Sequence, residues 1–328
     1  MDLIHQELEE IKKILQIKVP GSELISCHKN LVSVKLIKTK YKQLTACLQF
    51  PSDYPNEPIL IEVKSKVFSP SLVNMITSIC DKEAKKHIGR KQIILILKFL
   101  QQFLDDNPLL PCREEWAYIK KNILEECDSD KVKQKKGMIQ VKATRGNYFL
   151  KIQATIPNNY PEEPVKLSIE DHNFPGPMVY YFISQAKEYA RQATEPPLKK
   201  NPKAPAFKAE PHLKKTMEFL IKKCCKRFPQ ECCPMCGKQS LPENPADIIK
   251  DGKDDKYIER VYCGHLYHHG CMDAYMKTPP FENGKMCPTC GLRIYHDKWN
   301  ISPRLAEDRW AHGEARQREL EEVVDFLS

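Results

Sequence analysis

The chain has 328 residues, with 52 lysines and arginines against 43 acidic residues, and 41% of it is hydrophobic. This length suits three compact units of roughly 100 residues each, with enough apolar content for buried cores. No apolar run approaches the roughly 18 residues that cross a bilayer, and residues 1–7 lack the basic start and apolar core of a secretory signal. Fourteen cysteines without a leader therefore predict a reducing compartment, the cytoplasm or the nucleus, and exclude a disulfide-stapled secreted protein.

A repeated motif organises the first two thirds of the chain. Residues 50–59 read FPSDYPNEPI, and residues 156–165 read IPNNYPEEPV. Alternating strands are expected before each motif, at 44–50 and 148–156, and short apolar strands after it, at 59–63 and 165–169. Prolines on both sides of the tyrosine stop the strand and predict a rigid turn between two antiparallel strands.

Helices are expected on both sides of each strand pair. Amphipathic helices at 2–18 and 113–126 open the two units, and apolar helices such as 91–105 and 214–226 close them. Together these elements predict an α+β layer packed on an antiparallel sheet. The arrangement resembles the RWD domain, which shares its fold and its Tyr-Pro-x-x-Pro turn with E2 ubiquitin-conjugating enzymes. The resemblance implies two RWD-like domains, at residues 1–109 and 110–228.

The residues argue against active conjugating enzymes. E2 enzymes follow the turn with His-Pro-Asn and a nucleophilic cysteine, and the chain contains no His-Pro-Asn. Cys80 lies at a comparable distance from the first turn, but the apolar pattern of residues 75–80 predicts a buried helix face. We therefore expect no catalytic residue in either unit.

Basic residues gather in the second unit. Residues 195–227 carry ten lysines and arginines against three acidic residues, and their first part combines prolines with Lys199, Lys200 and Lys203. This composition predicts an extended insertion near residues 195–212. A patch for nucleic acid, ribosomal RNA or an acidic protein is one interpretation. A solvated loop is the favoured one, because no aromatic side chain lies among Lys199, Lys200 and Lys203 to stack on bases.

Eight cysteines and histidines near the C-terminus form the most specific pattern. They read Cys233-x2-Cys236, then Cys263-x-His265-x2-His268-x2-Cys271, then Cys287-x2-Cys290. Four half-sites of two ligands each make two closed tetrahedral Zn²⁺ sites, which leave no open position for an activated water. Cys232 and His269 adjoin proposed ligands but break the spacing, so we interpret them as supporting or bystander residues.

The ligand order resembles a RING finger of the H2 type, spanning residues 229–300. A DNA-reading finger would carry two histidines on a helix after its cysteines, and a PHD-type order would place one histidine fifth. Here histidine is both fourth and fifth. In the RING family the ligand pairs interleave, which implies one site of Cys233, Cys236, His268 and Cys271, and another of Cys263, His265, Cys287 and Cys290.

RING fingers recruit an E2 enzyme charged with ubiquitin, so the resemblance implies an E3 ubiquitin ligase or ligase subunit. E2 docking in the family uses positions that correspond to Met235, Tyr275 and Pro288; the alternative is that each side chain only packs the zinc core. Many active members carry a basic residue directly after the last ligand, where this chain has Gly291, with Arg293 two residues later.

The layout of two RWD-like units and a RING resembles the ubiquitin ligase subunit of the Fanconi anaemia core complex. It implies that the RWD-like units bind a protein substrate or partner, while the RING binds E2 and ubiquitin. Two alternatives stay open: a non-catalytic zinc scaffold, and nucleic-acid contact through the basic insertion. Residues 301–328 are expected to form a charged helix that packs on its own RING.

Overall fold

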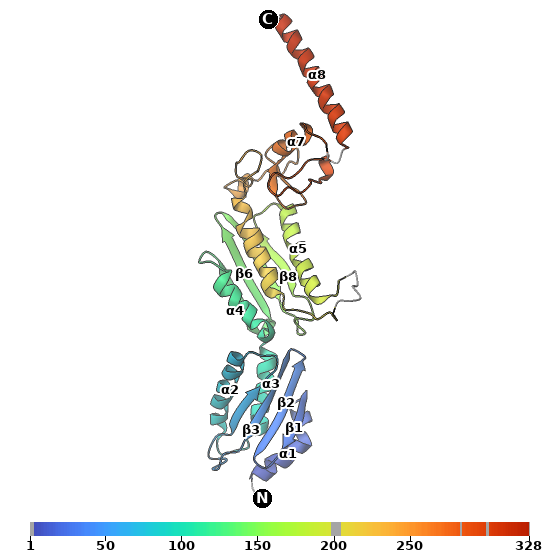
Figure 1. Ribbon diagram of the computed structural model, residues 1–328. Helices are drawn as coiled ribbons and strands as arrows, with labels where there is room; N and C mark the ends of the chain where they lie inside the picture. The colour runs from blue at the N-terminus through green and yellow to red at the C-terminus, as the bar shows by residue number, and fades with distance from the viewer. Residues whose placement is uncertain (1–2, 198–204, 283, 300–301, 328) are drawn as a thin grey trace. The chain divides into compact units, whose positions relative to one another are not determined.

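The computed structural model describes residues 3–197, 205–282, 284–299 and 302–327 (Figure 1). Grouped by their contacts, residues up to 221 form one compact part, and residues from 222 onward form another, which also takes in 144–150 and 172–176. Within the described ranges, no helix has both the length and the apolar character that a bilayer-spanning segment requires. Lys199, Lys200 and Lys203, which define the expected basic insertion, lie outside the described residues.

The first α+β unit, residues 3–112, has one helical layer on one sheet (Figure 1). Its antiparallel strands pair in chain order, and α3 packs on β2 and β3 while α1 contacts β1 and α2 contacts β4. Alternate residues of β3 are buried, and so are Val32, Val34 and Leu36 of β2 with Ser33 between them, as expected where one face of a sheet meets helices. The elements are α1 (Leu3–Lys18), β1 (Ser22–Cys27), β2 (Leu31–Thr39), β3 (Lys42–Gln49), β4 (Leu60–Lys64), α2 (Pro70–Ala84), α3 (Ile93–Asp106), and short 3-10 turns at Lys85–His87 and Leu110–Cys112.

Cys80 lies in the core of this unit. It is fully buried on α2, where burial, with Asp81 and Glu83 nearby, raises the pKa of its thiol to about 12. A thiol of this kind stays protonated and is a poor nucleophile. The interpretation of Cys80 as a core residue therefore agrees with its position.

The second α+β unit, residues 113–226, repeats this order of elements. Its strands also pair in chain order, β5-β6-β7-β8, and β5 and β6 are antiparallel. The elements are α4 (Arg113–Asn122), β5 (Ser129–Lys133), a 3-10 turn (Gln134–Lys136), β6 (Met138–Arg145), β7 (Tyr148–Thr155), β8 (Lys166–His172), α5 (Gly176–Thr194), α6 (Leu213–Glu218) and a π-helix (Phe219–Lys226). The opening helix ends at Asn122, not at 126, because the amides of Ile123 and Leu124 both bond to Ile119 O, which closes its last turn.

The tyrosine of the first Tyr-Pro turn helps to cap a distant helix. Tyr54 donates its hydroxyl hydrogen to Glu7 Oε2 at 2.5 Å and accepts a hydrogen bond from Gln92 N at 3.1 Å. The other oxygen of Glu7 accepts from Ile93 N at 3.1 Å. The first amides of a helix have no acceptor inside it, so this Tyr–Glu pair satisfies the N-terminus of α3.

The second unit builds the same cap from equivalent residues. Tyr160 donates to Glu115 and accepts from His212 N at 2.7 Å and Leu213 N at 3.0 Å. Glu115 Oε1 accepts from Lys214 N at 3.0 Å, at the start of α6. In both units, a glutamate of the opening helix and the turn tyrosine thus hold the start of a closing helix.

One member of this network differs between the units. Gln92 Oε1 accepts a hydrogen bond from Ile59 N at 2.9 Å, and His212 Nε2 accepts the equivalent bond from Val165 N at 3.0 Å. Since Nε2 accepts, the ring proton is on Nδ1, which donates to Glu210 O at 3.0 Å. Both side chains are fully buried, so the second unit requires a neutral imidazole where the first has an amide.

We expect His212 to make the second unit sensitive to acid. Burial lowers the pKa of His212 below its ordinary 6.5, despite the bond to the Glu210 carbonyl. The unfolded chain then binds the proton more readily, so this contribution to stability is complete above about pH 6.5 and is lost as pH falls through the folded pKa. His212→Gln, which copies Gln92, should flatten the free energy of unfolding of the second unit between about pH 7.5 and pH 5.

Urea unfolding followed by circular dichroism at several pH values measures this effect. Glu115, whose pKa is raised by burial, is unchanged in the variant, so its opposite pH dependence cancels in the comparison. The reciprocal variant Gln92→His should introduce the acid sensitivity into the first unit. Parallel pH profiles for wild type and His212→Gln would contradict the prediction.

The cysteine-rich segment, residues 229–299, has little regular structure. Its elements are a hairpin of β9 (Ile258–Arg260) and β10 (Leu266–His268), α7 (His269–Lys277), and 3-10 turns at Phe228–Gln230, Pro245–Asp247 and Asp297–Trp299. Seven buried residues form its core: Cys233, Val261, Tyr267, Met272, Cys287, Ile294 and Trp299. Two of the seven are cysteines of the predicted sites, so the core depends on the state of those thiols.

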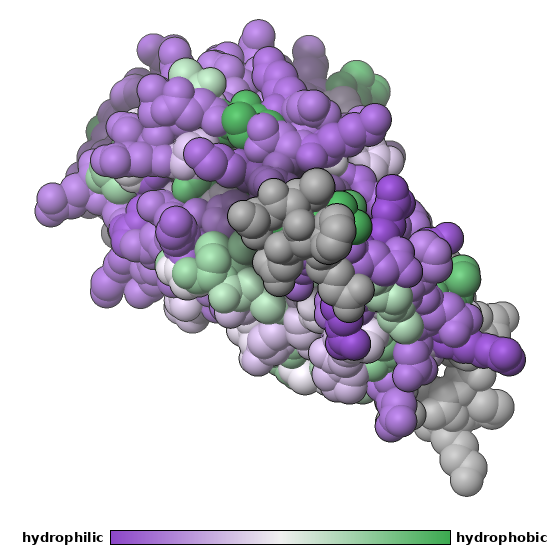
Figure 2. Space-filling model, turned by 90° about the horizontal axis from the view of Figure 1, so that it is seen from above, coloured by the Kyte–Doolittle hydropathy of each residue, from purple (hydrophilic) through white to green (hydrophobic). Residues whose placement is uncertain are grey.

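The last helix, α8 (Pro303–Leu327), corrects one expectation. Ala306 is its one buried side chain in the described ranges, and Leu320, Val323 and Val324 are 60%, 54% and 63% exposed. Among the described residues, the side of α8 near the cysteine-rich segment therefore lies in its first part, where Trp310, Gly313 and Gln317 line a pocket with residues of α7. The face of the molecule in Figure 2 is largely hydrophilic, and its apolar residues are scattered.

Candidate metal centre

Two short loops with the pattern Cys-Pro-x-Cys-Gly fold in the same way. Gly237 N donates to Cys233 O at 2.9 Å, and Gly291 N donates to Cys287 O at 2.8 Å. Both glycines have φ of +69°, a left-handed conformation that side chains rarely adopt. Each loop thereby folds back on itself, and its two cysteines lie in one cluster.

The β9–β10 hairpin supplies residues to both clusters. Cys263 and His265 lie in its turn, His268 ends β10, and Cys271 lies in the first turn of α7. His265 and His268 are three positions apart along extended chain, where side chains alternate between the two faces. The two histidines consequently belong to different clusters.

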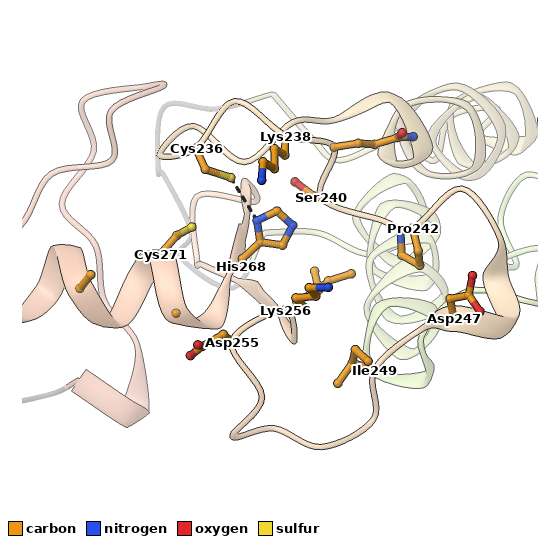
Figure 3. Close-up of a pocket in the computed structure, with 14 residues that line it drawn as sticks. Cys236, Lys238, Ser240, Pro242, Asp247, Ile249, Asp255, Lys256, His268 and Cys271 are labelled. Carbon is orange, nitrogen blue, oxygen red and sulfur yellow. Dashed lines mark hydrogen bonds between the residues drawn. The ribbon is translucent and has the colours of Figure 1, made fainter.

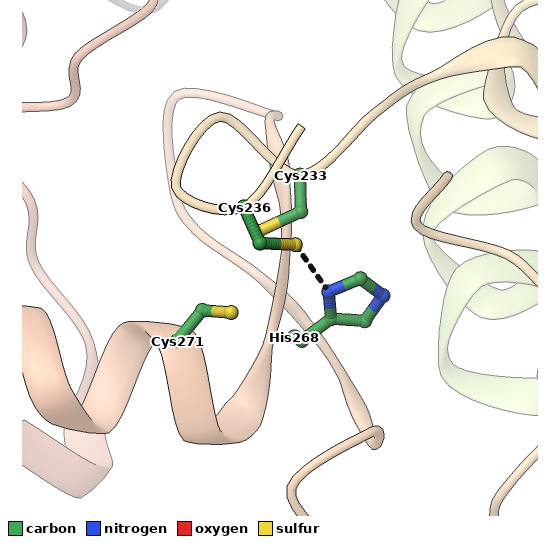
Figure 4. Close-up of side chains that lie close together, drawn as sticks. All are labelled: Cys233, Cys236, His268 and Cys271. Atoms are coloured by element: carbon green, nitrogen blue, oxygen red, sulfur yellow. Dashed lines mark hydrogen bonds between the residues drawn. The ribbon is translucent and has the colours of Figure 1, made fainter. Parts of the chain in front are cut away.

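Each cluster contains three cysteines and one histidine, with all ligand atoms within 4.8 Å of one another. Cys236 Sγ lies 3.3 Å from His268 Nδ1 (Figure 4), and Cys263 Sγ lies 3.4 Å from His265 Nδ1. A tetrahedral Zn²⁺ with Zn–S of about 2.3 Å and Zn–N of about 2.0 Å holds its ligand atoms about 3.5–3.8 Å apart. The sets are Cys233, Cys236, His268 and Cys271, and Cys263, His265, Cys287 and Cys290.

The pKa values of these thiols bear on whether a cation binds between them. Burial raises the pKa of Cys263 and of Cys271 to about 12. Burial opposes ionisation of Cys287 too, but hydrogen bonds from Tyr267, whose hydroxyl lies 2.9 Å from Cys287 Sγ, and from Cys290 N lower its pKa to about 6. Three thiolates cannot lie this close together without a positive charge among them. The donor sets and their spacing are consistent with two Zn²⁺ ions.

A buried glutamate holds the end of the segment against the hairpin. Glu259 on β9 binds His269 Nδ1 at 2.9 Å, His296 Nε2 at 3.3 Å and the Lys298 ammonium. Burial would raise the pKa of Glu259, but the bonds from His296, Lys298 and His269 lower it to about 2. Sequence spacing gave no signal for this cluster, because its members lie on a strand, a helix and a later turn. His269 thus supports the fold and is in neither ligand cluster.

Trp299 completes this support. Its indole Nε1 donates to Asp273 Oδ1 on α7 at 2.9 Å, and its ring lies 5.4 Å from the His269 ring and 4.8 Å from the His296 ring. Cys232 is exposed, and it pairs with Gln239 in an isolated bridge. It is a bystander to both clusters.

The three residues expected to contact an E2 enzyme all keep exposed surface. Met235 and Tyr275 are half-buried against the core of the cysteine-rich segment, and Pro288 is exposed. The Tyr275 hydroxyl donates to Met286 O at 2.8 Å, which fixes the ring. Met235 and Tyr275 therefore pack on the core and also keep surface that another protein could contact.

The position after the last ligand does not favour a basic side chain. Gly291 is exposed and left-handed, so any other residue there would strain the backbone. The guanidinium of Arg293 lies against Gly284, with Nε 2.7 Å from where a Cβ would stand, and 5.3 Å from the Tyr295 ring centre. These contacts fix the orientation of the Arg293 side chain, and neither Gly284 nor Tyr295 belongs to a Cys₃His cluster.

A pocket of about 910 Å³ adjoins the first cluster. Figure 3 shows Lys238, Ser240, Lys256 and His268 around it, with Asp247 on the long loop that precedes β9. Its lining mixes lysines, aspartates and aliphatic side chains, which selects no single class of ligand. The long acidic loop thus forms a wall of this pocket.

Two family models match the chain. Residues 2–104 match the RWD domain, and residues 247–290 match the zinc finger of C3HC4 type (RING finger). The chain contains an RWD domain and a RING finger. The RING match begins after Cys233 and Cys236, and it is the structure that brings this first pair to the other ligands. A comparison with curated proteins found no match.

These domains narrow the class of protein. A RING finger usually implies E3 ubiquitin ligase activity, and RING and RWD domains generally bind E2 enzymes. The chain is therefore E3-ligase-like or E2-interacting.

Proposed function

We propose that the protein is a RING-type E3 ubiquitin ligase, or a ligase subunit, that acts in the cytoplasm or nucleus. The observation that carries the proposal is the pair of interleaved Cys₃His clusters, six of whose eight residues lie within the RING match. In this proposal the eight cluster residues are the Zn²⁺ ligands of a RING-H2 finger at 229–300. The bound ions supply folding free energy, and closed four-ligand sites do no chemistry of their own.

The mechanism is positioning. Met235, Tyr275 and Pro288 would bind an E2 enzyme that carries ubiquitin, while the α+β units bind the protein substrate. Bringing a thioester and a lysine together removes much of the entropy cost of their encounter, and no residue of this chain forms a covalent intermediate.

We also propose that residues 110–228 form a second RWD domain after the first at 1–109. The repeated Tyr–Glu cap supports it, because in each unit the turn tyrosine bonds to a glutamate of the opening helix and both accept from amides at the start of a closing helix. Two RWD domains, a RING and the helix at 301–328 would then give the layout that resembles the Fanconi anaemia ligase subunit, with substrate bound by the RWD domains.

Met235→Ala should reduce ubiquitin transfer at least about tenfold, because truncating a hot-spot residue at the centre of an interface costs about 2 kcal/mol or more. The measurement is in vitro autoubiquitination with a panel of E2 enzymes. Tyr262→Ala is the matched control, since Tyr262 is 70% exposed in the same segment but is none of the three docking residues. Zinc content and circular dichroism must stay unchanged in both variants.

A non-catalytic scaffold is the second candidate, and Gly291 is the observation that favours it. The residue that would bridge E2 and ubiquitin is absent there, and Gly291 is left-handed. If the wild type binds E2 enzymes but supports chain formation with none of them, the scaffold replaces the ligase. Binding that is insensitive to Met235→Ala would remove the proposed docking surface as well.

A further inference from the structure

Most of the described surface of helix α8, which follows the RING in the chain, is exposed. After Ala306, which is buried, and Trp310, which is half-buried, the described side chains from 311 to 324 are exposed, apart from a half-buried Glu314 and Glu322, which is not described. Figure 1 shows α8 as one continuous helix. Helices in proteins gain most of their stability from packing one face against other elements, and most of the described length of this 25-residue helix has no such contact.

One line of residues along α8, apolar at both ends, has the spacing of a coiled-coil seam. Ala306, Trp310, Gly313, Gln317, Leu320 and Val324 succeed one another at alternating intervals of four and three, the period of the a and d positions. The first two pack at the RING, and the exposed Leu320 and Val324 continue the same line. The line that begins as an intramolecular contact is thus uncovered in the second half of the helix.

The charges beside this line are sorted by sign. Every e position is a glutamate (Glu307, Glu314 and Glu321), and the g positions between them are Arg309 and Arg316. In a parallel pair of helices, each g residue meets the e residue five positions later on the other helix. Arg309 would therefore face Glu314, and Arg316 would face Glu321, each twice across the pair. An antiparallel pair would set glutamate against glutamate and arginine against arginine.

Within one helix, the arginines at g and the glutamates five positions later cannot pair. Residues five apart do not face each other on a helix surface, where only spacings of three and four bring side chains together. Gln317 Nε2 does donate to Glu321 at 3.1 Å, but no ion pair joins Arg309 or Arg316 to an acid in the described part of the chain. The pattern is complementary to a copy of itself in the same register.

We propose that α8 binds a second copy of this chain as a parallel two-stranded coiled coil. Leu320 and Val324 form its apolar seam, with Gln317 as a polar seam residue that favours one register. The arginine–glutamate pairs fix the parallel orientation. Because the RING precedes α8, the two RING fingers of the dimer would lie at the same end of the helix pair.

The association should show in sedimentation equilibrium of the full chain, as a mass that rises toward two chains with concentration. Arg309→Glu with Arg316→Glu should weaken the dimer at least about tenfold, because every cross-helix pair becomes glutamate against glutamate. Glu314→Arg with Glu321→Arg should weaken it equally. An equimolar mixture of the two double variants should associate again, since each pair then joins opposite charges.

Arg304→Glu with Arg318→Glu is the matched control. It makes the same two charge reversals on α8 but at positions away from the seam, so the dimer should remain. Circular dichroism checks that α8 stays helical in every variant. A wild type that keeps the mass of one chain up to about 100 µM would overturn the proposal. So would a dimer that seam and control variants weaken alike, or a mixture that fails to reassociate.

Discussion

Replacing Cys233 by serine is expected to release both zinc ions and unfold the RING finger, while Cys232→Ser beside it leaves both ions in place. Cys233 is buried in the first cluster, and Cys232 is exposed and outside both. A structural Zn²⁺ contributes roughly 10 kcal/mol or more to folding, which exceeds what a small core supplies by itself. Among the residues that the structure describes, the hydrophobic cluster around Cys233 has seven buried members, Cys233 included.

The loss should extend to the second cluster because the two share one hairpin. His265 directly precedes β10 and His268 is its last residue, so release of His268 frees the strand that also positions Cys263 and His265. Elemental analysis should fall from two zinc ions per chain to none, with loss of the near-ultraviolet signal from Tyr267 and Trp299. The RWD domain at 2–104 should keep its far-ultraviolet helical signal. Retention of one zinc and a folded hairpin in Cys233→Ser would show that the clusters fold independently.

Tyr160→Phe is expected to cost about 3 kcal/mol of stability in the second α+β unit. The change leaves two backbone amides, those of His212 and Leu213, and the half-buried Glu115 without the hydroxyl that they share. Each buried polar group that loses its partner costs about 1–3 kcal/mol, and Tyr160 is fully buried, so water cannot replace the lost group.

Denaturant unfolding followed by circular dichroism measures the change in free energy. Tyr54→Phe should cost less, because Tyr54 is half-exposed and water can reach the site. Tyr180→Phe is the control, since Tyr180 is 75% exposed and should change stability by no more than about 0.5 kcal/mol. If Tyr160→Phe and Tyr180→Phe unfold at the same denaturant concentration, the shared cap contributes little and the prediction is wrong.

Local patterns in the sequence were enough for the elements and the ligand order. The Tyr-Pro motifs mark the strand ends at Gln49 and Thr155, and alternation predicts β3 and β7. Cysteine and histidine spacing predicts two sites of four residues, and the same eight residues are grouped in the structure. Such signals can be read in advance because strand periodicity and ligand spacing depend on residues close together in the chain.

Tertiary structure decided which distant residues meet. Glu7 on α1 caps α3, whose first residue lies 86 positions later, and Glu259 joins His269 to a turn at Lys298. No rule of sequence spacing predicts either set of contacts. The exposure of α8 was also missed, because a helix pattern predicts an apolar line but not the surface that covers it. Burial and hydrogen bonding between separate elements follow from how those elements pack, and a single sequence carries no direct record of that packing.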